Sequence, residues 1–93
     1  RTELYSMAGL QNTIPEVLRQ GKGIDLEILV TTPAEFRIEM VNLSSEAIWS
    51  ERAFFGRGIH KIRVPTDALD WGVYHLEIQG ALVDSRYKII IRG

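Results

Sequence analysis

The sequence predicts an all-β protein, folded as an antiparallel β-sandwich of six to seven short strands. Apolar side chains recur at every second position in several runs, such as residues 24–30 and 74–78, which is the period of a strand with one buried face. Gly, Pro, Asn and Asp separate these runs at short intervals. No candidate helix is long enough to form the crossover that a parallel sheet needs.

The first 23 residues are expected to form an extension or linker before the domain. Residues 3–7 can form a short strand. Residues 13–16 resemble a capping box, with Pro15 in the first turn and Gly21 closing a helix of about two turns. Residues 21–23 are then a flexible hinge.

The alternating runs of the first half predict three strands. In residues 24–30 the even-numbered positions are apolar, and the same alternation recurs in residues 36–40. Between residues 40 and 48, Asn42 and the serines after it favour a turn in which side chains bond their own backbone. Residues 48–54 form the third strand, which glycines at residues 56–58 end.

The second half continues with a strand over residues 58–64 and a short turn over residues 65–70, capped by Asp67. Trp71 then opens a strand that places Tyr74, Leu76 and Ile78 on one face. Turn residues near 79–85 lead into a final strand with its apolar side chains at residues 87, 89 and 91. The domain is therefore expected to span residues 24–93.

Composition excludes several classes of protein. The 93 residues suit one domain, and 45% of them are apolar. No run approaches the ~20 apolar residues of a transmembrane helix, and none has the pattern of an export signal. The chain begins at Arg1 without Met, which favours a fragment of something longer, and it has no cysteine for disulfides. A pI near 6.1 gives little support for nucleic-acid binding.

The net charge of −1 hides an asymmetry between the two halves. Residues 1–51 hold four basic and eight acidic side chains, whereas residues 52–93 hold seven basic and four acidic ones. We favour acidic and basic strands that face each other across ladders, where opposite charges contribute a few tenths of a kcal/mol, up to ~1. The alternative is a basic face that attracts an anionic partner.

The sequence contains no recognisable catalytic or metal-binding pattern. His60 and His75 lie inside strands, and Glu77 is the only nearby carboxylate at strand spacing, whereas structural zinc usually needs four ligands. The aspartates lack the spacing of a calcium loop, and no serine lies in a nucleophile elbow. We therefore expect no enzyme, no cofactor and no metal.

A set of ordered motifs resembles a known family. Residues 58–60 are followed by alternating Ile62 and Val64, then by Leu69, by Gly72-Val-Tyr74, and by a hairpin into residues 87–92. From about Ile24 to Arg92 the chain is similar to the C-terminal sorting domain of the Bacteroidetes type IX secretion system. In that family a Gly-x-Tyr strand opening and a basic residue near the chain end are usual.

The resemblance implies an Ig-like sandwich that is not an enzyme. It implies export via the periplasm to the outer membrane surface or the extracellular space, with outer-membrane translocon and attachment-complex proteins as partners. By this resemblance, the residues expected to bind a partner are Gly72, Tyr74, Lys88, Ile91, Arg92 and Gly93.

The sequence departs from the family pattern at three places. The family often has a Pro-x-Pro-like entry to its first strand, whereas here only Ile14-Pro15 lies upstream. It often has a Gly-Arg pair in the turn between its second and third strands, where this chain has residues 42–46. This chain also has one residue, Gly93, after the basic Arg92. These departures favour an uncleaved domain that is retained in a surface component of the secretion machinery. The final strand, with Lys88 and Arg92 outward, would offer an edge for strand addition or for an edge-strand dimer.

Side chains elsewhere suggest one further partner and one alternative function. Arg57, Lys61 and Arg63 form a candidate patch for anionic lipopolysaccharide. The alternative function is a generic Ig-like adhesion or carbohydrate-binding module, a fold that hosts many functions. It would need exposed aromatic side chains, and the candidates are Trp49, Phe54, Phe55 and Trp71.

Overall fold

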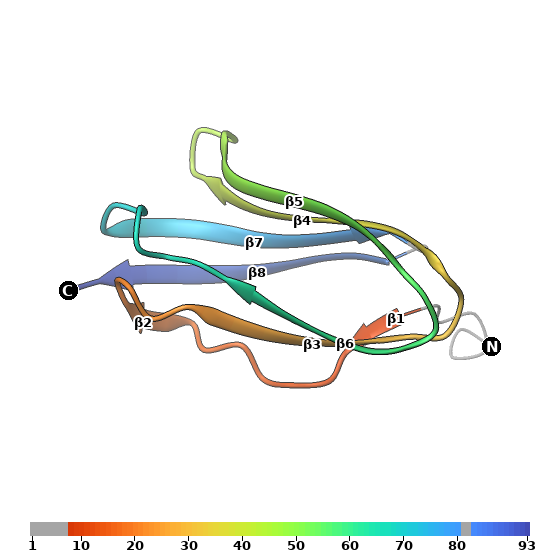
Figure 1. The fold of residues 1–93 in the computed structure, drawn as a ribbon. Coiled ribbons are helices and arrows are strands. Elements are labelled where there is room, and N and C mark those ends of the chain that lie inside the picture. The colour runs from red at the N-terminus through yellow and green to blue at the C-terminus, as the bar shows by residue number, and fades with distance from the viewer. Residues whose placement is uncertain (1–7, 81–82) are drawn as a thin grey trace.

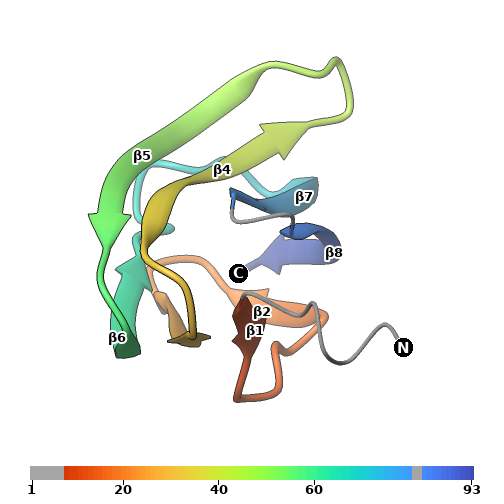
Figure 2. The ribbon, with the colours of Figure 1, turned by 90° about the vertical axis from the view of Figure 1, so that its right-hand side faces the viewer.

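The computed structural model describes residues 8–80 and 83–93, which form eight strands in two facing sheets (Figure 1). In chain order the strands are β1 (Ala8–Leu10), β2 (Val17–Arg19), β3 (Ile24–Val30), β4 (Ala34–Asn42), β5 (Ala47–Phe55), β6 (Gly58–Val64), β7 (Gly72–Gly80) and β8 (Val83–Arg92). One sheet has the order β1-β3-β6 and the other β2-β8-β7-β4-β5. Figure 2 shows the two layers end-on. The predicted all-β sandwich is confirmed, and the described residues form no helix that could cross a membrane.

The helix expected after residue 13 is wrong. Val17, Leu18 and Arg19 form β2 instead, which runs parallel to the last three residues of β8. The Ile90 amide donates to the Glu16 carbonyl at 2.6 Å, and the Gln20 amide donates to the Arg92 carbonyl at 2.6 Å. A helix of two turns is marginal by itself, whereas the strand fills an open sheet edge and buries Leu18.

The N-terminal segment belongs to the sandwich rather than preceding it. β1 pairs with β3 in one sheet and β2 pairs with β8 in the other, so residues 11–16 cross between the sheets. Ala8 and Leu18 both lie in the core. The boundary expected at residue 23 therefore does not separate two parts of the molecule. The short strand expected at residues 3–7 lies outside the described residues.

The core fills the space between the two sheets with alternate residues of the long strands. β3 and β6 pair from Ile24↔Val64 to Val30↔Gly58, and β7 pairs with β4 on one side and β8 on the other. Each fully buried Leu, Ile or Phe stabilises the fold by roughly 1.5–3 kcal/mol. The largest fully buried side chains include Phe36, Ile24, Leu26, Ile28, Ile38, Met40, Leu76, Ile89 and Ile91.

The turn after β4 follows the prediction. The Asn42 side-chain oxygen accepts the amides of Ser44 and Glu46, both at 2.9 Å. The Ser45 amide donates to the Asn42 carbonyl at 3.0 Å. Asn42 therefore replaces the backbone ladder with local hydrogen bonds where the strand must end.

The connection between β6 and β7 contains a β-turn from Thr66 to Leu69, with Asp67 at its second position. The Leu69 amide donates to the Thr66 carbonyl at 3.1 Å. Thr66 is fully buried, and its hydroxyl binds the β2–β3 turn. This connection therefore closes one end of the sandwich.

The expectation that the final strand is an edge is wrong, because β8 lies between β2 and β7. Only its first part, Val83 to Ile89, has a single neighbour, since β2 pairs with Ile90, Ile91 and Arg92. The outermost strands are β2 and β5 in the larger sheet and β1 and β6 in the smaller one.

Candidate partner-binding end of the sandwich

The partner-binding residues that the resemblance singled out converge on one end of the larger sheet. β7 begins where β8 ends, so Gly72 pairs with Ile91, Tyr74 with Ile89, and His75 with Lys88. Arg92 and Gly93 follow directly, at the end that carries the label C in Figure 1. We call this region the C-terminal end of the sandwich.

These residues differ in their access to a partner. Ile91 is 1% exposed and Tyr74 7% exposed, so both belong to the core. Gly72 is half-buried, and its φ of 156° is unfavourable for side chains other than glycine. Lys88, Arg92 and Gly93 are exposed. A partner at this end would therefore contact the exposed three, while the others shape the backbone beneath.

Tyr74 forms a tyrosine corner, a hallmark of Ig-like sandwiches. Its hydroxyl donates to the Asp70 carbonyl at 2.7 Å, across the connection that leads into β7. Burial raises the pKa of Tyr74, and the nearby negative charge of Asp70 raises it further. The spacing of Asp70, Gly72 and Tyr74 is therefore explained by the fold itself.

Gln20 holds the C-terminal end together. Its backbone amide binds the Arg92 carbonyl, and its side-chain amide donates to the Leu69 carbonyl at 2.6 Å. Its side-chain oxygen accepts the Trp71 indole N–H at 3.2 Å. Sequence reasoning missed Gln20 because its partners lie 49 and 51 residues further along the chain.

Trp71 is the exposed aromatic side chain of this end, with 67% of its surface accessible. The terminal Gly93 packs directly against its indole ring, since a Cβ on Gly93 would lie 2.1 Å from Trp71 Cζ2. A side chain at residue 93 would therefore displace the exposed indole ring. Trp71 and Gly93 form one contiguous surface beside Arg92.

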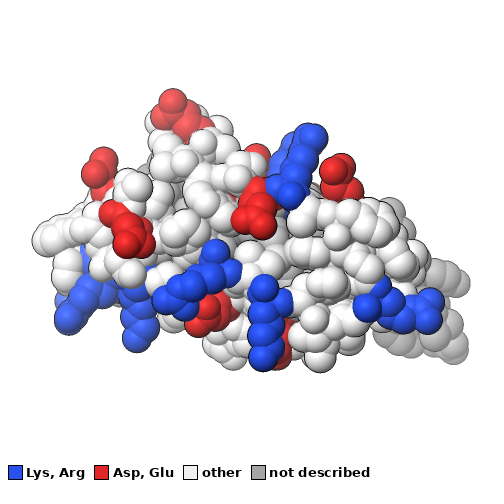
Figure 3. All heavy atoms as spheres, in the orientation of Figure 1, with Lys and Arg blue, Asp and Glu red and all other residues white. Residues whose placement is uncertain are grey.

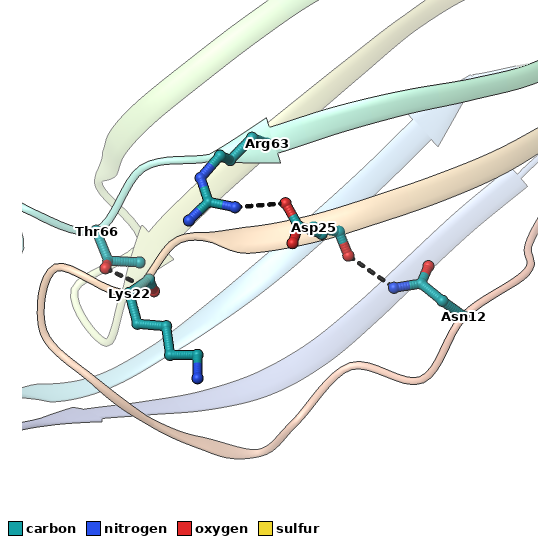
Figure 4. Close-up of polar contacts among 5 residues, drawn as sticks. All are labelled: Asn12, Lys22, Asp25, Arg63 and Thr66. Carbon is teal, nitrogen blue, oxygen red and sulfur yellow. Dashed lines mark hydrogen bonds and ion pairs between the residues drawn. The ribbon is translucent and has the colours of Figure 1, made fainter.

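The basic side chains of β6 face carboxylates on β3. Arg63 Nη1 lies 2.7 Å from Asp25 Oδ1 (Figure 4). Lys61 Nζ lies 3.8 Å from Glu27 Oε2. Both pairs are cross-strand neighbours, which supports the interpretation that opposite charges meet across the ladder. Arg57, the third member of the predicted anionic-ligand patch, makes no ion pair with any residue that the structure describes.

Asn12 covers the outer edge of β3 with its side chain. Its Nδ2 donates to the Asp25 carbonyl at 2.7 Å, and its Oδ1 accepts the Glu27 amide at 2.9 Å (Figure 4). The preceding Gln11 amide donates to the Glu27 carbonyl at 2.7 Å. The side-chain amide thus continues the strand pairing that β1 begins. No sequence signal marks this role, because an Asn in a connection usually indicates only a turn.

The aromatic candidates for a carbohydrate platform are dispersed. Phe55 is buried, where it stacks on His60 with the ring centroids 4.5 Å apart, and Trp49 is half-buried. Phe54 is 70% exposed, but it pairs with Glu35 at the start of β4, whereas Trp71 lies beyond the other end of that sheet. The two exposed rings therefore do not share one surface.

The described residues contain no group of three or more His, Cys, Asp or Glu side chains that could hold a metal ion. His60 Nε2 lies 2.7 Å from the Gly56 carbonyl, and His75 lies on the outer face of the larger sheet beside Lys88. Cavities of about 200 to 460 Å³ open on the surface of the described residues. A smaller cavity of about 60 Å³ lies beside the core residues Phe36 and Ile78.

The fold and the tyrosine corner define the chain as an Ig-like β-sandwich. No protein-family model matches it, and no curated protein matches it. Among solved structures it is similar to part of the crystal structure of beta-glucosidase from Listeria innocua in complex with glucose. The TM-score is 0.63 at 11% identity, over 96% of this chain and 16% of that chain. The likeness shows the fold alone.

Proposed function

We propose that this chain is a non-enzymatic sorting and anchoring domain of the type IX secretion kind. It is recognised by outer-membrane translocon and attachment-complex proteins, and it travels through the periplasm to the cell surface. It is retained there, uncleaved, as part of a surface component of the machinery. The observation that supports the proposal is the convergence of Lys88, Arg92 and Gly93 with Trp71 at the C-terminal end.

The mechanism that this geometry supports is recognition of a surface rather than of a free terminal strand. β2 covers the end of β8, so strand addition at Ile90, Ile91 and Arg92 would first require β2 to leave. A partner contacting Trp71, Arg92 and Gly93 needs no such opening. The aromatic ring supplies apolar area and Arg92 supplies charge, the residue types that dominate interface energetics.

The test is transport of a reporter. Residues 1–93 are fused to the C-terminus of an exported reporter in a type IX-competent cell and in the same strain without the translocon. We expect protease-accessible reporter on the surface of the first strain alone. A folded fusion that stays in the periplasm of both strains, or reaches the surface of both, contradicts the proposal.

Anionic lipopolysaccharide remains a second proposed partner. Lys61 and Arg63 already face carboxylates, so Arg57 is the member of the predicted patch whose charge is most available. Binding of purified lipopolysaccharide that is lost in Arg57→Gln and kept in Arg63→Gln would support this site. Equal loss in both variants, or no binding by the unchanged domain, would count against it.

The exposed Trp71 favours one alternative, a carbohydrate-binding or adhesion module. A sugar ring can stack on an exposed indole, and Gln20 beside it offers hydrogen-bonding groups. Saturable glycan binding that is lost in Trp71→Ala and kept in Phe54→Ala would favour this alternative over the sorting domain.

A further inference from the structure

Five of the ten basic side chains of the described residues form an ion pair with a neighbouring carboxylate, and Arg52 and Arg57 are among the five that do not. Ion pairs of 2.7 to 3.8 Å join Arg37, Lys61, Arg63, Arg86 and Lys88 to their partners. Arg19, Lys22 and Arg92 have no such pair within the described residues, and all three side chains are exposed. Arg19 pairs with Arg92, and Lys22 follows in the turn after β2, so all three lie at the C-terminal end. Figure 3 shows several basic side chains on the side of the molecule that carries the label C in Figure 1. We call them the terminal cations.

Pairing of β2 with β8 forces two of these charges together. Arg19 and Arg92 are direct neighbours in the parallel register, so their side chains leave the same face of the sheet. Hydrogen bonds on both sides of this position, from Ile90 to Glu16 and from Gln20 to Arg92, lock that register. Like charges directly opposite each other destabilise a sheet. The fold therefore tolerates a repulsion that an anion between the two guanidinium groups would remove.

Lys22 reaches the same region from the other side. The Lys22 amide donates to the Arg19 carbonyl at 3.1 Å, which closes a turn with Gly21 at its third position. Thr66 fixes this turn, because its hydroxyl donates to the Lys22 carbonyl at 3.0 Å and accepts the Gly21 amide at 3.0 Å (Figure 4). The backbone that carries Lys22 is thus held in place.

A surface cavity of about 460 Å³ adjoins these cations. Arg19 and Lys22 supply its charged lining, and its other walls are Pro15, Val17, Leu18 and Gly23. Arg19 therefore stands between Arg92 on one side and the cavity on the other. The hollow combines positive charge with apolar walls, which suits a ligand that has an anionic head and an apolar portion.

Nearby acidic side chains do not cancel this charge. Glu16 pairs with Lys88 at 3.6 Å. Asp67 and Asp70 lie exposed on the β6–β7 connection, and neither forms an ion pair with a terminal cation.

We propose that Arg19, Lys22 and Arg92 bind a phosphate-bearing ligand whose apolar part occupies the adjoining cavity. Two guanidinium groups side by side match the oxygens of a phosphate or diphosphate by bidentate hydrogen bonds, and Lys22 adds a third charge. The proposal does not depend on secretion and is tested on the purified chain.

The first test measures thermal stability with and without inorganic pyrophosphate at low ionic strength, where surface charges are least screened. We expect pyrophosphate to raise the Tm of the unchanged chain, because a ligand that binds only the folded state stabilises it. In Arg92→Gln the Tm without pyrophosphate should stay equal or rise, since a like-charge contact is removed. Its affinity for pyrophosphate should fall by about tenfold or more, as loss of a hydrogen bond to a charged group implies.

Two controls separate the site from a general charge effect. Arg86→Gln removes a cation that already pairs with Glu77, and Arg37→Gln removes a cation that already pairs with Glu39. Both should retain the response to pyrophosphate. The proposal is overturned if pyrophosphate leaves the Tm of the unchanged chain as it is, or if either control loses the response as fully as Arg92→Gln.

A second test distinguishes the source of the phosphate. Co-sedimentation with phosphatidylglycerol vesicles, against phosphatidylcholine vesicles, reports on a lipid headgroup, and the titration above reports on a soluble phosphate. Where pyrophosphate raises the Tm, additional Arg92-dependent binding to the anionic vesicles supports a lipid ligand. A pyrophosphate response that depends on Arg92, without binding to the vesicles, supports a soluble ligand. If neither pyrophosphate nor the vesicles bind in a way that depends on Arg92, the site is overturned.

Discussion

The Tyr74 hydroxyl joins the start of β7 to the connection before it through one hydrogen bond of 2.7 Å to the Asp70 carbonyl. We expect Tyr74→Phe to lower the free energy of unfolding by about 1 kcal/mol, and by up to about 3, because a part-buried hydrogen bond is lost. Urea denaturation measures the change. Tyr87→Phe is the matched control, since the Tyr87 hydroxyl lies in the same sheet and takes part in no hydrogen bond of the described residues. Equal losses in both variants contradict a structural role for the corner.

The raised pKa of Tyr74 makes stability depend on alkaline pH. Because its pKa in the folded chain lies above the ordinary value of 10.0, its contribution is complete below pH 10 and is lost as pH rises through the folded pKa. As pH rises above 10.0, the unchanged chain should lose more stability than Tyr74→Phe. Parallel loss in the two proteins would show that the Tyr74 hydroxyl does not cause it.

Gly80 ends β7 where its backbone approaches β4. A Cβ at this position would lie 2.5 Å from the Glu35 carbonyl, and φ is 140°, so Gly80→Ala meets both a clash and backbone strain. We expect a loss of roughly 1–3 kcal/mol or more in the free energy of unfolding. Gly56→Ala is the control, because a Cβ there meets nothing within 4 Å, and it should be neutral or slightly stabilising. A neutral Gly80→Ala would contradict this packing.

At the scale of strands, Asn12 protects the edge of β3. Asn12→Ala removes the two hydrogen bonds to Asp25 and Glu27 and exposes the edge at those residues. We expect a loss of about 1–2 kcal/mol and faster hydrogen exchange at the Glu27 amide. Gln11→Ala keeps the backbone bond from residue 11 to Glu27 and should leave that exchange rate unchanged.

β5 is the longest outermost strand among the described residues, and it carries a charge that protects it. Trp49, Ala53 and Phe55 are the more buried positions of its alternation, and Glu51 shares their phase while staying exposed. A strand added at this edge would have to bury that carboxylate. We expect Glu51→Val to self-associate at lower concentration than the unchanged chain, measured by sedimentation velocity. Glu35→Val, on the internal strand β4, should remain as soluble as the unchanged chain.

The long strands are predictable from the sequence because alternation over seven or more residues leaves one choice of buried face. β3 and β7 follow their apolar positions closely, and Asn42 ends β4 by the predicted turn. In β6, Ile62 and Val64 turn inward, but Ile59 is exposed and His60 takes the inward phase. β2 is not predictable in this way. With three residues it has no period to detect, and its pairing with β8 depends on an edge that exists only in the folded molecule.

At the scale of the whole molecule, the N-terminal segment completes both sheets and leaves the opposite side, formed by β5 and β6, open. Gln20, Thr66 and the terminal cations could not be predicted, because their partners are brought together only by this closure. The residues taken from the family resemblance did converge, although Tyr74 and Ile91 are buried. The spacing of these residues in the sequence therefore reflects what the fold requires as well as what any partner requires.

The central claim is that a partner engages the surface of the C-terminal end and that no reactive group is involved. Surface display of the reporter fusion tests it with two matched double variants. Trp71→Ala with Arg92→Ala removes one aromatic and one cation at the C-terminal end, and Phe54→Ala with Arg57→Ala removes the same kinds of side chain at the other end. With both variants folded by circular dichroism, we predict that the first loses most surface reporter and the second keeps it. Equal display by the two, or loss in the second alone, contradicts the account.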